Sequence, residues 1–440
     1  MPKETGRGPL SGFRDMLAEQ MIPRQQMIAT IRSVYEKYGF TPLDTPALEK
    51  QETLNGKYGE EGDKLMYKFQ DNGGRLVALR YDLTVPLARV VAQHRSEIQL
   101  PYKRYQVGPV WRGESPQAGR YREFVQFDAD VVGSKSSMVE AETLSMMSEA
   151  MTELGADTLI RVNNRRILDA LVEKSGVGED KARKLIGTID KVEKIGVDAA
   201  LSEIRDSFGD QTAGLVQSYL SVSGSSQERL QAVEQLLGGS QAAKEGVTNL
   251  TEVFNLLKAA GYSEDQITFD QTIARGLDYY TGIIYETSLK ALPKLGSVCS
   301  GGRYDNLISA LGGPDLPAVG TSIGVDRLFD GLQQLGLLQG AKTPAQVMVA
   351  NFGETTAQEH MRIATSLRRG GIPTEMYYEA DKIGKQLKFA DRLGIQYAVL
   401  MGSDEIANGI ARVRNLSTGE QVDIPAEQLT DFLRDKIQQG

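Results

Sequence analysis

The stretch Arg275-Gly-Leu-Asp-Tyr-Tyr-Thr-Gly-Ile-Ile-Tyr-Glu286 combines chemistry and structure more densely than any other part of the chain. It places one guanidinium, one carboxylate and two phenols within six residues. It ends in the short apolar run Ile283-Ile-Tyr285, which is typical of a strand. Because a strand fixes the direction of each side chain, the polar groups beside it would be aimed at a common site.

Two glycine-rich segments follow, Ser300-Gly-Gly-Arg-Tyr-Asp305 and Gly320-Thr-Ser-Ile-Gly-Val-Asp-Arg-Leu328. Strand-like sequence extends from about Ile267 to Val325. Earlier in the chain, Tyr102 to Trp111 and Arg122 to Val132 flank a polar loop, which predicts an antiparallel strand pair. We therefore expect a β-rich domain assembled from distant segments.

Length and composition restrict the class of protein. The 440 residues predict two or three domains, and 40% hydrophobic with 25% charged residues is typical of a soluble globular protein. No apolar run approaches the roughly 18 residues of a membrane span, and the N-terminus lacks the pattern of a secretion signal. We therefore expect a cytoplasmic protein that does not bind membranes. The net charge of -8 disfavours indiscriminate nucleic-acid binding but leaves room for a local basic surface.

The single cysteine, Cys299, excludes an internal disulfide and a cysteine-based zinc site. The only two histidines, His94 and His360, disfavour a multi-histidine metal centre and a Ser-His-Asp triad. Because neither histidine lies near Cys299 in sequence, packing is the preferred interpretation of this thiol over a nucleophilic role.

The residue composition and the spacing of apolar residues change at two points along the chain. From about 167 to 262 aromatic residues thin out and aliphatic residues recur at helical spacing, which predicts a helical insertion. After Pro344, strands alternate with helices, which predicts a small α/β domain with a largely parallel sheet.

Three arginines, Arg112, Arg120 and Arg122, lie on or beside the polar loop between the paired strands. Neighbouring guanidiniums repel one another unless an anion or carboxylates compensate, and each can grip phosphate oxygens in a bidentate way. A polyphosphate is one such anion. A solvated charged hairpin is the alternative that this pattern leaves open.

The strand after the loop carries an acidic face. Gln126 and Asp130 lie four residues apart, so they share a face with Phe124 and Asp128. A carboxylate pair is costly to bury unless it gains cationic or hydrogen-bonding partners. The pattern therefore indicates a polar pocket whose ligand supplies such partners.

Together these segments resemble the histidyl-tRNA synthetase family. The stretches 275–286 and 300–305 resemble its two histidine-specific signatures, 320–328 resembles motif 3 of the class II synthetases, and 112–124 resembles motif 2. The helix and proline-containing segment of residues 8–49 resemble motif 1, which is usually a dimer interface. A plain helix followed by an edge strand is the alternative for that segment.

The resemblance implies an α+β fold: a class II antiparallel β-sheet catalytic domain flanked by helices, with a helical insertion and a C-terminal α/β anticodon-binding domain. The expected boundaries are 1–166 and 263–335 for the catalytic domain, 167–262 for the insertion and 344–440 for the anticodon-binding domain.

The implied activity is a ligation in two steps. L-histidine and ATP form histidyl-adenylate and pyrophosphate, and histidine then passes to the 3′-terminal adenosine of the histidine tRNA. The implied partners are L-histidine, ATP and this tRNA, in a homodimer. Mg²⁺ is expected to bind mainly through the ATP phosphates, with no metal site built from side chains.

The resemblance also assigns residues. The implied ATP-binding residues are Arg112, Glu114, Arg120, Phe124 and Arg327. The implied histidine-binding residues are Asp82, Thr84, Arg112, Gln126, Asp130, Arg275, Tyr279, Tyr280 and Tyr304. Among these, Asp130 and Tyr280 would bind the imidazole, and Asp82, Thr84 and Gln126 the backbone groups. The pattern alone allows Asp82 to be a helix N-cap instead.

The implied catalytic residues are Arg275 and Arg112. A fixed guanidinium facing the α-phosphate would stabilise the charge that develops when the histidine carboxylate attacks. For Arg275, an ion pair with Asp278 or Glu286 is the alternative. The leading rival function is a histidine-sensing regulatory paralogue that does not charge tRNA; such paralogues usually lack the C-terminal domain and the catalytic arginine.

Overall fold

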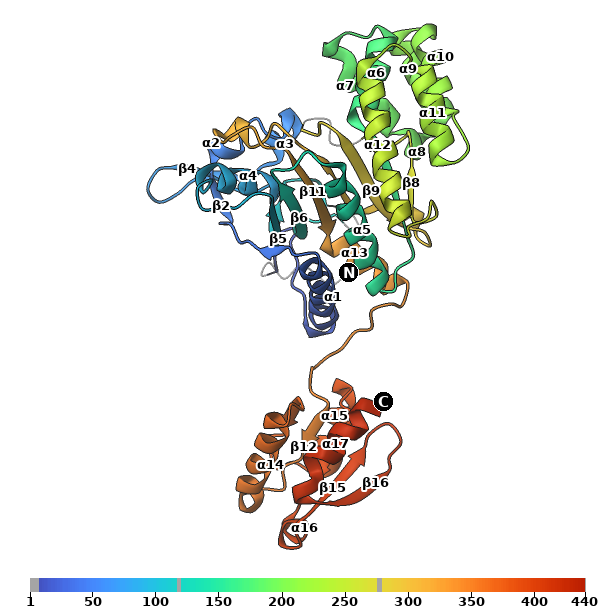
Figure 1. Ribbon diagram of the computed structural model, residues 1–440. Helices are drawn as coiled ribbons and strands as arrows, with labels where there is room; N and C mark the ends of the chain where they lie inside the picture. Colours follow the sequence, from blue (N-terminus) through green and yellow to red (C-terminus); the bar gives the residue numbers. More distant parts are fainter. Residues whose placement is uncertain (1–7, 117–119, 275–278, 440) are drawn as a thin grey trace. The chain divides into compact units, whose positions relative to one another are not determined.

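The computed structural model describes residues 8–116, 120–274 and 279–439 (Figure 1). Residue contacts divide the chain into two compact units. The first combines the chain up to Asp15 with Met27–Leu338, and the second combines Met16–Gln26 with the chain from Gln339 onward.

An eight-stranded sheet forms the centre of the first unit, in the order β1-β5-β6-β11-β10-β9-β7-β8. Neighbouring strands run antiparallel, except that β1 is parallel to β5 and β7 to β8. The strands are β1 (Thr41–Pro42), β5 (Tyr102–Trp111), β6 (Glu123–Val132), β7 (Thr158–Asn164), β8 (Ile267–Phe269), β9 (Ile283–Leu289), β10 (Ser297–Arg303) and β11 (Ala318–Gly324).

Strand β6 has two different faces. Phe127, Ala129 and Val131 are apolar and buried, and the Phe127 ring centroid lies 5.0 Å from that of Tyr35 in α1 (Ala18–Lys37). The alternating residues point the other way and are polar, yet they are also nearly inaccessible. Helix α13 (Val325–Gln334) packs against β6, β10 and β11, and α5 (Ser137–Glu153) packs against β7 and β11.

A second, smaller sheet of the first unit has the order β2-β4-β3. It consists of β2 (Leu48–Lys50), β3 (Lys68–Gln70) and β4 (Leu76–Leu79), and it is accompanied by α2 (Gln51–Leu54), α3 (Gly59–Leu65) and α4 (Thr84–Gln93). The chain passes directly from β4 through Asp82 into α4, so this sheet positions the start of that helix.

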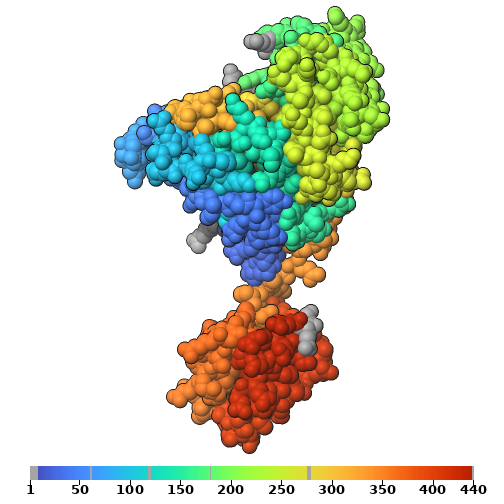
Figure 2. Space-filling view, in the orientation of Figure 1, coloured from blue at the N-terminus to red at the C-terminus, as the bar shows by residue number. Residues whose placement is uncertain are grey.

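Helices fill the chain between β7 and β8. They are α6 (Arg165–Ser175), α7 (Glu179–Asp190), α8 (Val192–Ile195), α9 (Val197–Phe208), α10 (Asp210–Leu220), α11 (Ser226–Leu236) and α12 (Gln241–Ala259). Their buried aliphatic residues pack against one another, and α12 also packs against α5 and β7. In the space-filling view, the green and yellow-green atoms of these helices form one continuous surface (Figure 2).

The second unit contains a five-stranded sheet in the order β13-β12-β14-β15-β16. Its strands are β12 (Val347–Val349), β13 (Thr374–Met376), β14 (Tyr397–Leu400), β15 (Ile410–Asn415) and β16 (Gln421–Pro425), with α14 (Ala357–Arg369), α15 (Ile383–Leu393), α16 (Ser403–Ala407) and α17 (Leu429–Gln439). The first three strands in this order are parallel, and β15 and β16 add an antiparallel hairpin. The sheet therefore contains more antiparallel pairing than the largely parallel sheet that the alternation of strands and helices predicted. Buried His360 hydrogen-bonds to the carbonyl oxygen of Met401 at 2.7 Å as part of this core.

The predicted α+β class is confirmed: a mainly antiparallel sheet flanked by helices, with a further C-terminal α/β unit. Within the described part of the chain, none of the helices combines the length and apolar character needed to cross a bilayer.

We expect Gly301→Ala to destabilise the first unit by about 3 kcal/mol, at the upper end of ordinary overpacking. The added Cβ would lie 2.1 Å from the carbonyl oxygen of Gly320 and 2.6 Å from the Tyr285 ring, so the central strands would have to separate. Urea unfolding can be followed by the fluorescence of the single tryptophan, Trp111 of β5.

The matched control is Gly187→Ala in α7, where an added Cβ meets no atom within 4 Å. Because alanine favours helix over glycine, this variant should gain up to about 1 kcal/mol. Equal unfolding midpoints for the two variants would contradict the close approach of β10 and β11.

Candidate active site

Two adjoining cavities lie at the centre of the main sheet. We call the first the arginine pocket; its volume is about 240 Å³ and its lining includes Arg112, Arg120 and Arg327. We call the second the carboxylate pocket; its volume is about 260 Å³ and its lining includes Asp82, Asp128 and Asp130. The two cavities share four lining residues: Arg112, Gln126, Ser300 and Ser322.

Arg112 is held in a defined orientation at this shared wall. Its Nε donates to the carbonyl oxygen of Tyr81 at 3.2 Å. Its guanidinium carbon lies 4.3 Å from the ring centroid of Tyr81 and 5.2 Å from that of Phe124. The guanidinium therefore stacks on both rings and donates one hydrogen bond, and these contacts restrict its orientation before any ligand binds.

The remaining cations of the arginine pocket also have protein partners. Arg120 forms an ion pair with Glu114 at 3.1 Å, and Arg327 donates to the carbonyl oxygen of Ser297 at 2.9 Å. Arg14, from the segment before α1, forms an ion pair with Asp326 at 2.5 Å, and the other oxygen of Asp326 accepts from the amide of Val125 at 2.7 Å. These contacts join the hairpin loop, β10 and α13 around one cavity.

In the carboxylate pocket, Asp130 is paired by the protein itself. Arg104 of β5 lies 2.6 Å from its Oδ2, and the Tyr304 hydroxyl donates to its Oδ1 at 2.5 Å. Burial raises the pKa of Asp130, and both Arg104 and Tyr304 oppose this shift. Arg104 is inaccessible to solvent, so this is a buried ion pair that also carries a hydrogen bond.

Asp82 contacts the first turn of α4 and also faces a cavity, although the N-cap residue of that helix is Leu83. Its Oδ1 accepts from the amide of Val85, in the first turn of α4, at 3.1 Å, and from the Tyr58 hydroxyl at 2.8 Å. It also lines the carboxylate pocket. Burial raises the pKa of Asp82, while these hydrogen bonds and Arg112 lower it.

Asp128 differs from both neighbours. Its side chain is buried, and its Oδ1 has no hydrogen-bond partner among the described residues. Burial raises the pKa of Asp128 to about 7; Arg104 lowers it, whereas Asp130 and Asp82 raise it.

Cys299 lines the arginine pocket but is almost fully buried. Its Sγ lies 3.0 Å from the Thr321 hydroxyl, and burial raises the pKa of the thiol to about 12. Because the thiol stays protonated near neutral pH, the geometry favours the packing interpretation.

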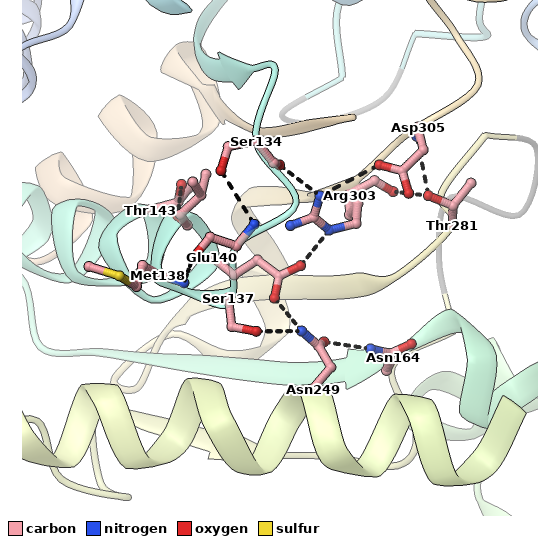
Figure 3. A network of polar contacts seen from close by, with 12 residues as sticks. Ser134, Ser137, Met138, Glu140, Thr143, Asn164, Asn249, Thr281, Arg303 and Asp305 are labelled. Carbon is pink, nitrogen blue, oxygen red and sulfur yellow. Dashed lines mark hydrogen bonds and ion pairs between the residues drawn. The ribbon is translucent and has the colours of Figure 1, made fainter. Parts of the chain in front are cut away.

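Figure 3 shows a polar network around Arg303 and Glu140. Arg303 Nε donates to Glu140 of α5 at 2.6 Å, and its Nη1 donates to the carbonyl oxygen of Ser134 at 3.2 Å. The backbone around Arg303 holds Thr281: its carbonyl oxygen accepts from the Thr281 amide at 2.8 Å, and the Asp305 amide donates to the Thr281 hydroxyl at 3.2 Å. Arg303 therefore fixes the segments that carry Tyr280 and Tyr304.

The same network continues into the helical insertion (Figure 3). The second oxygen of Glu140 accepts from Asn249 of α12 at 2.6 Å, and Asn249 accepts from Asn164 at 2.8 Å. Asn164 also accepts from the amide of Arg166 at 3.0 Å, so it caps α6. A continuous chain of hydrogen bonds thus joins α6 and α12, the first and last helices of the insertion, to the segments that carry Tyr280 and Tyr304.

The structure gathers most of the residues singled out in the sequence into these two cavities; Arg122 lines neither and donates instead to the carbonyl oxygens of Glu114 and Ser11. The arginine pocket contains Arg112, Glu114, Arg120, Phe124 and Arg327. The carboxylate pocket contains Asp82, Thr84, Arg112, Gln126, Asp130, Tyr279, Tyr280 and Tyr304. Arg275, together with Asp278, lies outside the described residues.

Several supporting residues were not singled out in the sequence. Arg104 and Tyr58 each contact a pocket carboxylate from another element, and Arg14 contacts the carboxylate of Asp326. No local pattern marks them. The alternation of side chains along the strand placed Asp128 on the same face as Gln126 and Asp130. This alternation does not distinguish Asp128 from Asp130.

Comparisons with known proteins agree across the whole chain. A family model described as histidyl-tRNA synthetase matches residues 12–328, and one described as anticodon binding domain matches residues 346–436. The chain is 42% identical to a histidine–tRNA ligase of Rhodopirellula baltica, over 98% of each protein. It is 41% identical to that of Gloeobacter violaceus, over 95% of this chain and 96% of the relative.

Solved structures give the same result. A histidyl-tRNA synthetase from Nostoc sp. PCC 7120 superposes with a TM-score of 0.88 at 33% identity, covering 98% of this chain and 99% of that one. A Bacillus halodurans protein described as an ATP phosphoribosyltransferase regulatory subunit/histidyl-tRNA synthetase has a TM-score of 0.75 at 21% identity, covering 87% and 96%. This second likeness shows a shared fold alone.

We expect Asp128→Asn to change how stability depends on pH. The pKa of Asp128 is about 7 in the folded protein and about 3.9 in an unfolded chain, so the folded state binds more protons between these values. The wild type should therefore lose stability relative to the variant as pH rises from about 4 through 7, by at most about 4 kcal/mol. Urea midpoints measured for both proteins from pH 5 to 9 test this; parallel curves would count against it.

We expect Arg303→Ala and Glu140→Ala each to cost about 3–5 kcal/mol, because each leaves a buried charge without its partner. The double variant should lose clearly less than the sum, because the two residues interact directly. Urea unfolding of the wild type, the two single variants and the double variant completes the double-mutant cycle. Additive losses would mean that the pair does not couple α5 to β10.

Proposed function

The chain belongs to the histidyl-tRNA synthetase family and ligates histidine to its tRNA, and from this premise we propose how its two cavities divide the reaction. Histidine occupies the carboxylate pocket and ATP occupies the arginine pocket. Histidyl-adenylate forms at the shared wall and pyrophosphate leaves. The terminal adenosine of the tRNA then accepts histidine.

The shared wall is the observation that carries this proposal. Arg112 and Gln126 belong to both cavities, so ligands in the two cavities meet beside these side chains. A carboxylate from one side and an α-phosphate from the other repel each other in a dry site. A fixed guanidinium between them screens the repulsion and favours an in-line approach.

The carboxylate pocket suits the chemistry of histidine. Asp130 and Tyr280 bind the imidazole, while Asp82, Thr84 and Gln126 bind the backbone groups. Tyr279 and Tyr304 line the cavity; the Tyr279 and Tyr280 hydroxyls are 3.4 Å apart. The existing partners of Asp82 and Asp130 orient these carboxylates in advance, which lowers the entropic cost of binding.

The arginine pocket suits ATP. Arg112 holds the α-phosphate, Glu114 and Phe124 position the adenine, and Arg120 and Arg327 reach the γ-phosphate. The ion pair between Arg120 and Glu114 would have to open or rearrange as the phosphates bind, because phosphate and carboxylate oxygens compete for the same guanidinium.

Mg²⁺ arrives as part of the nucleotide substrate, bound mainly to the β- and γ-phosphates. Among the described residues there is no cluster of three or more histidine, cysteine, aspartate or glutamate side chains able to hold a metal ion. The two carboxylates of the arginine pocket, Glu114 and Asp326, already pair with Arg120 and Arg14.

Further parts of the proposal concern the whole molecule. Residues 344–440 bind the anticodon of the histidine tRNA, residues 1–166 with 263–335 form the catalytic domain, and residues 167–262 form the insertion. The protein works as a cytoplasmic homodimer through the segment that resembles motif 1. Sedimentation of the full chain at micromolar concentration would test the dimer.

The rival function, a histidine-sensing regulatory paralogue, has less support. The chain carries a C-terminal unit that matches the anticodon binding domain, and its close relatives are histidine–tRNA ligases over nearly their full length. Pyrophosphate exchange with each of the twenty amino acids separates the two functions. Exchange with histidine alone supports the ligase, whereas no exchange with any amino acid favours the sensor.

We expect Arg275→Ala to reduce the rate of histidine-dependent exchange by about two orders of magnitude, roughly 3 kcal/mol of transition-state stabilisation. Because Arg275 is proposed to act on developing charge, the KM for ATP should change much less. The control is Arg95→Ala, which removes an exposed arginine and should leave the exchange rate unchanged. Equal losses in rate and in ATP binding would contradict the catalytic role of Arg275.

A further inference from the structure

Three buried carboxylates line the carboxylate pocket, and Asp128 has the fewest protein partners of the three. Asp130 has Arg104 at 2.6 Å and the Tyr304 hydroxyl at 2.5 Å. Asp82 has the Tyr58 hydroxyl at 2.8 Å and the Val85 amide at 3.1 Å. Asp128 has neither an ion pair nor a partner for its Oδ1 in the described part of the chain, although it is only 2% exposed.

Asp128 occupies the middle of the proposed histidine site. On β6 it lies between Gln126, at the shared wall, and Asp130, at the imidazole end. Residues two apart on a strand are separated by about 7 Å, so Asp128 faces the centre of a ligand that spans both neighbours. Its flanking positions are Gln106 on β5 and Ser322 on β11, and Ser322 hydrogen-bonds to its carboxylate.

The nearby cations are already occupied. Arg104 pairs with Asp130. Arg80, which interacts electrostatically with Asp128, donates to the carbonyl oxygens of Thr45 and Pro109. An unpaired buried carboxylate costs free energy unless a ligand supplies the missing charge and hydrogen bond. Its position therefore calls for a positively charged N–H donor in the pocket.

We propose that Asp128 is a further substrate-binding residue that accepts a hydrogen bond from an N–H of the bound histidine, on the α-ammonium or the imidazole ring. Asp82 and Asp130 each have two protein partners, whereas Asp128 has only the Ser322 hydroxyl and its Oδ1 is left for the substrate. A ligand that places no N–H there leaves the Oδ1 without a partner, so it binds more weakly. This inference rests on the proposed function of the pocket.

The test is Asp128→Asn in the full-length protein, assayed by pyrophosphate exchange. Losing a hydrogen bond to a charged group should raise the KM for histidine about 10- to 100-fold. The KM for ATP should stay within about twofold, because Asp128 does not line the arginine pocket. The thermal midpoint should stay equal or rise, since the variant removes an unpaired buried charge; a purely structural carboxylate would predict a fall.

The control is Glu123→Gln, which makes the same charge change at an exposed position of β6 and should leave both KM values unchanged. Competitive inhibition by imidazolepropionic acid, which is histidine without its amino group, identifies the donor. If its inhibition constant is unchanged in the variant, Asp128 meets the ammonium; if it rises with the KM for histidine, Asp128 meets the ring. Both results support the inference.

An unchanged KM for histidine in the variant would overturn the inference while leaving the ligase function intact. Absence of histidine-dependent exchange in the wild type would instead overturn the proposed function. Should Asp128→Asn fail to fold, the smaller Asp128→Ser variant takes its place. If neither variant folds, the role of Asp128 is structural and the inference is wrong.

Discussion

The buried ion pair between Arg104 and Asp130 organises the site more than any other contact. The two groups lie 2.6 Å apart with side-chain exposures of 0% and 3%. Breaking such a pair from one side costs about 3–5 kcal/mol, because the remaining charge stays buried. Arg104 also donates to the carbonyl oxygen of Leu83 at 3.3 Å, next to Asp82. One guanidinium thus links the Asp130 carboxylate of β6 to the backbone next to Asp82.

Glycines make room for this arrangement. A Cβ on Gly320 would lie 1.8 Å from the Asp130 carboxylate, and one on Gly302 would lie 2.9 Å from the Tyr280 ring. Gly301, Gly302 and Gly320 are therefore required by the close approach of backbone and side-chain atoms of other segments rather than by their own backbone conformation. This explains why glycine-rich strands occupy the middle of a sheet, where glycine is otherwise destabilising.

Hydrogen bonds link the helical insertion to the segments beside the carboxylate pocket. Arg165, at the start of α6, donates its amide to the carbonyl oxygen of Gly282 at 2.7 Å, and Asn249 of α12 meets Glu140, the partner of Arg303. The start of α6 therefore contacts the segment around Thr281 directly, and α12 is linked to it through Glu140 and Arg303. A displacement of these helices would act first on the tyrosines beside the carboxylate pocket.

The amino-acid sequence by itself determined the elements and the chemical type of the site. Strand parity placed Gln126 and Asp130 on one face, and helical spacing marked the insertion, because both depend on neighbours along the chain. The antiparallel hairpin of β15 and β16 was not predicted, because the alternation of strands and helices favoured a parallel sheet.

Only the tertiary structure decided which polar groups have partners. Asp128 and Asp130 are indistinguishable by spacing, yet Arg104 and Tyr304 reach one and not the other. Asp82 both accepts from the Val85 amide in the first turn of α4 and lines the carboxylate pocket, because α4 begins at the cavity wall; the N-cap residue itself is Leu83. Partners of this kind come from residues far apart in the chain, and ion pairs and desolvation depend on distance in space, which local sequence does not encode.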